Sequence, residues 1–193
     1  MRRPFAAVLC AAALGLTAAS SVAPAQQKTD THAGAGGDRR IVLTIKDLME
    51  SIVDPSADVV WGAVGTVADK QGIQDLSPKT REEWLDLRRA AVRLIEGGNL
   101  LMMPGREAAP AGVKSEAPGV ELEPAEITEL IRREPKSFDV FAKALQDIGL
   151  EALQAIEAKN TDRLIEVGGR MEEVCESCHK TFWYPQDHAA TRN

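Results

Sequence analysis

The sequence of 193 residues predicts an all-α fold built around four long helical segments. Apolar residues recur at spacings of three and four in four separate stretches, a period typical of helices that bury one face. Segments that contain proline, glycine or asparagine separate these stretches. We find no internal repeat and no polar–apolar alternation of useful length that would predict a strand. These observations favour a single domain of packed helices.

The chain opens with the pattern of a secretory signal peptide, residues 1–25. Arg2 and Arg3 precede an apolar run, and the Ala-x-Ala sequence at Ala23–Ala25 is typical of a cleavage site. The apolar run is too short and too rich in alanine to predict a membrane span. We therefore expect an exported, periplasmic protein with no membrane span in the mature chain.

Removal of these 25 of the 193 residues would leave 168 residues and two cysteines, Cys175 and Cys178, because Cys10 lies in the peptide. The formal net charge would change from −6 to −8, since the peptide contains two arginines and no acidic residue. An acidic protein is poorly suited to nucleic acid or anionic lipid, so we expect neither as a partner. Glycines and polar residues predict a flexible leader over 26–40.

The first predicted helix covers about 41–70. Asp54-Pro55 interrupts it, and we expect a kink there or a restart with Asp54 as the N-cap. Residues 72–77 are expected to form a connection. The second helix is predicted from Pro78-Lys79-Thr80 to Pro104. Its predicted inner face consists of Trp84, Leu87, Ala91, Leu94, Gly98 and Leu101.

Residues 104–123 are rich in proline and glycine and predict a long surface loop. A short helix is expected from Pro124 to about Glu134, and Pro135 begins the third long helix. Asn160 or Thr161 is the expected N-cap of the fourth, which runs to about Trp183. The predicted inner faces of these two long helices are Phe138, Phe141, Leu145, Ile148, Ala152 and Ala155, and then Leu164, Gly168, Met171, Cys175, Cys178 and Phe182.

The fourth helix carries Cys175-Glu176-Ser177-Cys178-His179 near its C-terminal end. Positions i, i+3 and i+4 share one face of a helix, so both thiols and the imidazole should point the same way. Cys-x-x-Cys-His is the attachment signature of a c-type haem, which is held by two thioether bonds and an axial histidine. Because the cysteines lie on the inner face of their helix, we expect the haem to be buried among the helices.

The same two cysteines also allow other interpretations of the motif. A redox dithiol does not need the adjacent histidine, and no βαβ pattern surrounds this motif. A structural disulfide is a further alternative. A zinc site needs four ligands, and only His188 in the tail over 186–193 could join Cys175, Cys178 and His179. The zinc interpretation would make the chain a metal-stabilised structural domain.

An exported chain with four helical segments and Cys-x-x-Cys-His near the end of the fourth resembles the cytochrome c′ family, the class II c-type cytochromes. The resemblance covers about 41–185. It implies an up-down-up-down four-helix bundle with covalently bound haem c. By position, it also implies thioether bonds from Cys175 and Cys178 and axial ligation of the iron by His179.

Members of this family differ in the sixth ligand of the iron, which comes from the first helix. Low-spin members of the cytochrome c-556 type have a methionine there. Five-coordinate members have an apolar residue and bind small gases such as nitric oxide or carbon monoxide. Met49 matches this position, although methionine is also a common core residue. Trp61 is expected to be a core or haem-packing aromatic residue.

The resemblance implies an exported monohaem cytochrome that carries single electrons and meets a redox partner protein. The alternative is a five-coordinate cytochrome c′ that binds small gases. Outside the motif we find no convincing nucleophile–base pair, so we do not expect an enzyme. Many relatives pair into homodimers through their helices, which leaves both a monomer and a homodimer open.

Overall fold

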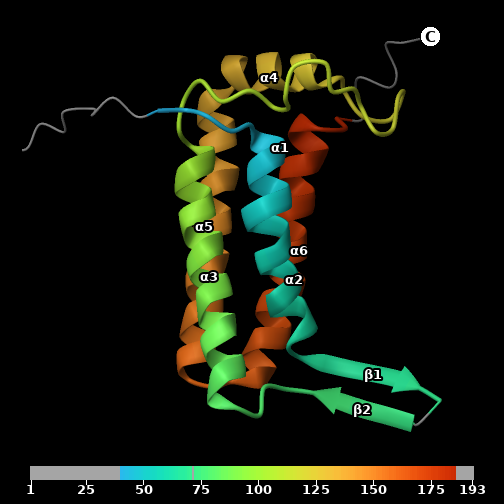
Figure 1. The fold of residues 1–193 in the computed structure, drawn as a ribbon, viewed down its shortest axis with the longest axis vertical. Helices are drawn as coiled ribbons and strands as arrows, with labels where there is room; N and C mark the ends of the chain where they lie inside the picture. Colours follow the sequence, from blue (N-terminus) through green and yellow to red (C-terminus); the bar gives the residue numbers. More distant parts are fainter. Residues whose placement is uncertain (1–39, 71, 186–193) are drawn as a thin grey trace, which may run out of the picture. The chain divides into compact units, whose positions relative to one another are not determined.

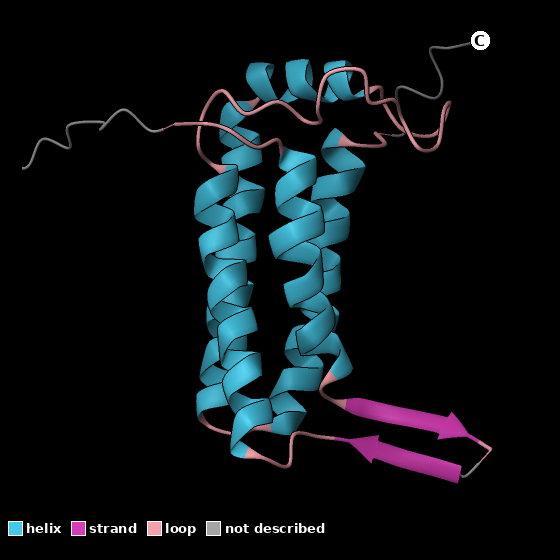
Figure 2. Ribbon diagram, viewed as in Figure 1, coloured by secondary structure: helices cyan, strands magenta, loops and turns pink. Residues whose placement is uncertain are grey.

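The computed structural model describes residues 40–70 and 72–185. The predicted signal peptide, the predicted leader up to residue 39 and the tail over 186–193 lie outside the described residues. The described part is mostly helical, as the sequence predicts, with one small sheet of two strands (Figure 2). Among the helices of these two ranges, none is long and apolar enough to cross a membrane.

The first helical segment consists of three consecutive parts: α1 (Ile45–Leu48), the π-helical turn η1 (Met49–Val53) and α2 (Asp54–Gly62). Thr44 caps its beginning. The Thr44 hydroxyl accepts a hydrogen bond from the Asp47 N–H at 3.2 Å, and the Thr44 N–H donates to the Asp47 carboxylate at 2.8 Å. This reciprocal capping box sets the start of the helix four residues later than the apolar pattern suggests.

The prediction of a restart with Asp54 as N-cap is wrong, because the helix continues through Asp54-Pro55. Asp54 has helical dihedral angles, φ −58° and ψ −50°, and its N–H donates to the Met49 carbonyl. That bond spans five residues instead of four and forms the π-helical turn. Because proline has no N–H to donate, the irregular turn lies directly before Pro55.

Two short strands follow the first helical segment, where the sequence predicted more helix and a connection. β1 (Gly65–Asp69) pairs with β2 (Gly72–Leu76) in antiparallel register, with Val67 opposite Gln74 (Figure 1). Gly65 and Gly72 have φ values of +135° and +124°, which other residues rarely adopt. The predictions of a helix to residue 70 and of no strands are therefore wrong: glycines end the helix, and the β-branched residues between them favour extended backbone.

The remaining helices begin and end close to their predicted limits: α3 (Arg81–Leu101), α4 (Pro124–Arg133), α5 (Pro135–Glu157) and α6 (Thr161–Phe182). Thr80 and Asn160 cap α3 and α6 by accepting backbone N–H groups three residues later, at 3.2 Å and 2.9 Å. The structure describes every residue between α3 and α4, and none of them is helical, so the predicted loop over 104–123 is confirmed.

The long helices pack along their predicted inner faces. α3 contacts α5, α5 contacts α6, and α2 contacts both α3 and α6. Figure 1 shows these segments side by side, each running opposite to the one before, with α4 across their ends. Leu94, Ala152, Leu164 and Met171 are fully buried at their contacts. The core therefore runs along the axis of the helices and reaches the cysteine motif at one end.

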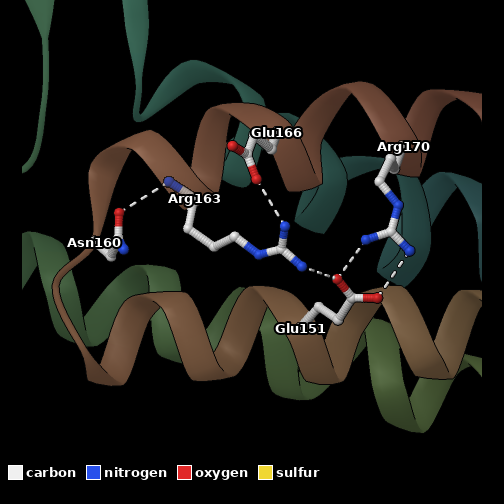
Figure 3. A network of polar contacts seen from close by, with 5 residues as sticks. All are labelled: Glu151, Asn160, Arg163, Glu166 and Arg170. Carbon is white, nitrogen blue, oxygen red and sulfur yellow. Dashed lines mark hydrogen bonds and ion pairs between the residues drawn. The ribbon is translucent and has the colours of Figure 1, made fainter.

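Charged side chains at the surface link α5 to α6 (Figure 3). The Glu151 carboxylate accepts hydrogen bonds from Arg163 at 2.6 Å and from Arg170 at 2.9 Å. Arg163 also pairs with Glu166 at 2.7 Å. The hydrogen bond from Arg170 is the main reason why the pKa of Glu151 lies below its usual value. Because the arginines are exposed and Glu151 is only half-buried, the network links the helices without dominating their stability.

Candidate functional site

The Cys-x-x-Cys-His motif lies in the C-terminal half of α6. Met171 and Phe182, which flank it on the inner face of the helix, are 0% and 1% exposed. Cys175, Cys178 and His179 lie between them and are half-buried. The helical spacing therefore places both thiols on the inner face, as the sequence predicts.

A narrow cavity lies beside the motif. Cys175, Cys178 and His179 line it from α6, and Met49 lines it from η1. The structure thus brings the predicted sixth ligand to the three predicted haem-binding residues. The other lining residues are apolar except for one carboxylate: Val53, Asp54, Leu101, Phe138, Phe141, Ala142, Leu145, Val174 and Trp183.

These donors fit a haem c in kind: two thiols for thioether bonds, an imidazole and a thioether for the iron, and apolar surroundings for the porphyrin. The cavity has a volume of about 40 Å³. That is room for about three water molecules, far less than a porphyrin occupies. The side chains that line the cavity would therefore have to move apart to hold the group.

A second, larger cavity of about 310 Å³ adjoins the first. The two share Met49, Asp54, His179 and Trp183. The far side of the larger cavity is the loop between α3 and α4, whose residues over 108–122 contribute much of its lining. Both candidate iron ligands, Met49 and His179, therefore border a space that this loop covers.

Both cysteines are free thiols in a poorly solvated environment. Burial raises the pKa of Cys175 to about 11 and that of Cys178 to about 12; the nearby Asp54 charge also raises the pKa of Cys175. Desolvation in turn raises the pKa of the Asp54 carboxyl, while the charge of His179 opposes that change. A reactive dithiol needs a lowered thiol pKa, so this environment is unlike that of a redox-active Cys-x-x-Cys.

Aromatic residues surround the motif. The Phe182 ring makes edge contacts with Phe138 and Phe141, at centroid distances of 5.3 Å and 6.0 Å. The Trp183 ring lies 6.0 Å from the His179 imidazole. Trp183 was not among the site residues predicted from the sequence. Its position four residues after His179 was an available signal, because i and i+4 share a face of a helix.

The chain end beyond α6 is held beside His179. The N–H groups of Trp183 and Tyr184 both donate to the His179 carbonyl, at 2.8 Å and 3.0 Å. The Tyr184 hydroxyl donates to the Glu176 carboxylate at 2.5 Å. Burial, together with this hydrogen bond, raises the pKa of Tyr184 to about 12. These bonds fix the aromatic residues that follow the motif.

Trp61 lies away from the motif. Its indole N–H donates to the Gly168 carbonyl at 2.9 Å, and it lines a separate cavity between α2 and α6 to which no residue of the motif contributes. A Cβ atom at Gly168 would lie 3.2 Å from the Trp61 ring, which explains the glycine. Gly169 has no such neighbour, since a Cβ there would meet nothing within 4 Å.

Among the residues that the structure describes, no group of three or more histidine, cysteine, aspartate or glutamate side chains is placed to hold a metal ion. His188, which the zinc interpretation requires, lies outside these residues. Comparison of the chain with protein-family models, curated proteins and solved structures found no match. The function is therefore inferred from the motif and from the surroundings that the fold gives it.

Proposed function

We propose that this chain is an exported, periplasmic monohaem c-type cytochrome that carries single electrons and exchanges them with a redox partner protein. Haem c would be attached at Cys175 and Cys178, with His179 as an axial ligand of the iron. The observation that supports this most strongly is the position of Met49. It lies near the other end of the sequence, yet it lines the same cavity as the three motif residues.

We also propose that the long helical segments form an up-down-up-down four-helix bundle around the haem. The contacts of α2 with α3, α3 with α5, α5 with α6 and α6 with α2 form a closed ring, which supports this arrangement. Such a ring surrounds the cavity with residues from different helices. Covalent attachment to one helix would then place the haem among all of them.

Each residue of the site has a distinct role in this proposal. When bound, a haem iron exchanges one electron between its ferric and ferrous states. Cys175 and Cys178 would fix the position of the group, and His179 would donate a ring nitrogen to the iron. The Met49 sulfur would favour the ferrous state and raise the reduction potential. Apolar neighbours such as Phe141 would exclude water and act in the same direction.

The alternative is a five-coordinate cytochrome c′ that binds nitric oxide or carbon monoxide. One observation favours it: Met49 also borders the larger cavity of about 310 Å³, which has room for a small ligand. In this alternative, Met49 is a core residue and does not ligate the iron. The two functions thus differ in the role of a single side chain.

The absorption spectrum of the purified mature chain, oxidised and then reduced, tests the proposal. Sharp ferrous bands of a low-spin haem, with a weak far-red sulfur-to-iron band, would support a methionine-ligated electron carrier. A high-spin spectrum that shifts when carbon monoxide is added would support the gas-binding alternative. A colourless protein from a host able to attach haem would contradict both.

Substitution of Met49 separates the two functions at the level of one residue. We expect Met49→Leu to convert the low-spin spectrum into a high-spin one that responds to carbon monoxide, because leucine has no sulfur to bind iron. Met171→Leu is the matched control, because it makes the same change of side chain at another methionine. Met171 is fully buried in α6 and does not line the cavity. An unchanged spectrum for Met49→Leu would make Met49 a core residue.

A further inference from the structure

The loop between α3 and α4 is anchored at two points, Ala108 and Leu122, both of which line the larger cavity. Ala108 and Leu122 are 0% and 5% exposed and pack in a small apolar cluster with Ile127. The Ala108 N–H donates to the Thr128 hydroxyl, and the Leu122 N–H donates to the Trp183 carbonyl, at 2.9 Å and 2.8 Å. These two residues therefore fix the ends of the segment 109–121.

The segment 109–121 itself is only weakly attached to the core. All of its residues are described, and none of them is buried. Its hydrogen bonds are largely internal or to its own flank: the Ala117 carbonyl accepts from Val120 and Glu121 at 3.0 Å, and the Ser115 hydroxyl donates to Glu121 at 3.3 Å. Such a segment can move as a unit while its anchors stay in place.

Two glycines bend the chain within this segment. Gly112 and Gly119 have φ values of +85° and +87°, where other residues are strained. A Cβ atom at either glycine would meet nothing within 4 Å, so packing does not require glycine at these positions. The positive φ angles are what require glycine at these positions. Glycine also allows the backbone angles to change when the segment moves.

One ion pair joins the segment to the other wall of the cavity. The Lys46 Nζ of α1 lies 2.5 Å from the Glu116 Oε1 and 2.8 Å from the Glu50 Oε1. Glu50 follows Lys46 by four residues within the same helical segment, so only the Glu116 pair crosses the cavity. Lys46, Glu50 and Glu116 all line this space, together with Met49 and His179.

We propose that residues 109–121 form a gate over the larger cavity, with the Lys46–Glu116 ion pair as its latch. The gate controls the access of small molecules of the class that ligate haem iron to the space bordered by Met49 and His179. This inference rests on the proposed function for its ligand. The movement of the segment can be measured without haem.

The experiment compares Glu116→Gln with Glu50→Gln in the full chain. Both variants remove one carboxylate of the cavity and one ion pair of Lys46, but only Glu116→Gln removes the contact across the cavity. Amide hydrogen exchange of residues 109–121 measures opening in the haem-free and the haem-loaded chain. The rate of imidazole binding to the ferric haem-loaded chain measures access; it is compared in the Met49→Leu background, where no protein sulfur competes with imidazole for the iron.

We expect Glu116→Gln to raise both the amide exchange rates of residues 109–121 and the imidazole binding rate by a factor of about 1.5 to 5, the range for one solvated ion pair. Glu50→Gln should raise neither rate, and exchange in α3 should not change in either variant.

Unchanged amide exchange in Glu116→Gln would overturn the latch. Faster exchange with an unchanged imidazole rate would overturn the gate. A chain that takes up no haem would contradict the proposed function instead, and exchange in the haem-free chain would still decide whether the latch holds the segment.

Discussion

The interface of α3 with α5 and the region where η1 and α6 line a common cavity are both built from inward-facing apolar residues, but they end in different structures. In the first, the helices approach closely: a Cβ atom at Gly98 would lie 2.7 Å from the Ala142 carbonyl oxygen, and one at Gly149 would lie 3.0 Å from Ile95. In the second, Met49, Cys175 and Cys178 leave a cavity between the helices. Periodicity determines which face of a helix is inside, whereas the size and chemistry of the residues on that face decide whether the interface closes or forms a site.

The difference in chemistry is as clear as the difference in packing. The closed interface has glycine and alanine at its points of closest approach. The open interface has three sulfur atoms and an imidazole around its cavity. A cavity with a few converging polar or polarisable groups is typical of a binding site, while small residues at a close contact are typical of packing.

The largest expected effect concerns the thiols of the open interface. At pH 8, alkylation of Cys175 in the folded, haem-free chain should be about 100-fold slower than in denaturant, because burial raises its pKa from 9.0 to about 11 and each pKa unit removes about 90% of the reactive thiolate. Mass spectrometry after timed alkylation measures both rates. Equal rates would mean that the cavity does not shield the thiols.

The same pKa values predict how stability depends on pH. The folded state favours the protonated thiols, so their contribution is complete below pH 9.0 and is lost as the pH rises through about 11 for Cys175 and about 12 for Cys178. The free energy of unfolding of the haem-free chain should therefore fall over this range. A variant with serine at both positions should lose this part of the pH dependence.

The next effect compares two glycines. Gly98→Ala should destabilise the chain by about 1–3 kcal/mol, because its Cβ would overlap Gln146 and the Ala142 carbonyl in the closed interface. Gly169→Ala, where a Cβ meets nothing within 4 Å, should stabilise α6 by about 0.5–1 kcal/mol. Urea unfolding measures both changes. If Gly98→Ala were neutral, the α3–α5 interface would be looser than described.

A smaller effect is expected at the far end of the α2–α6 contact. Trp61→Phe removes the hydrogen bond to the Gly168 carbonyl and should lower the free energy of unfolding by about 0.5–1.5 kcal/mol, while the spectrum of the proposed haem stays the same. Trp183→Phe is the comparison, since Trp183 borders both cavities and lies 6.0 Å from His179. Trp183→Phe should change the reduction potential of the proposed haem. A change of spectrum in Trp61→Phe would instead restore Trp61 as a haem-packing residue.

The smallest effect is expected for the surface charges that link α5 and α6. Glu151→Gln weakens the pairing with Arg163 and Arg170 and should lower the Tm by no more than about 2 °C, because the pairs are solvated. Glu166→Gln, which affects Arg163 alone, should have a still smaller effect. Thermal unfolding at low and high salt measures both. A fall of more than about 5 °C would show that the network, and not the buried face, holds α6 in place.

Local sequence signals predicted much of the described fold. The starting points of α3, α4, α5 and α6 follow from Thr80, Pro124, Pro135 and Asn160, whose effects on the backbone extend over a few residues. The turn to strands after Gly62 was missed, because apolar spacing through Val67 resembled a helix. The π-helical turn before Pro55 was missed as well, since the missing N–H of proline can be accommodated in more than one way.

The sequence by itself determined the inner face of α6 and the placement of both thiols and the imidazole on one side of it, because helix geometry converts residue spacing directly into direction. Only the tertiary structure determined which residues of other elements lie against that face. It brought Met49 and Trp183 to the motif, placed Trp61 on Gly168 instead, and covered the larger cavity with residues 109–121. These contacts join residues far apart in the chain, and they depend on how whole helices and loops pack, which no local pattern encodes.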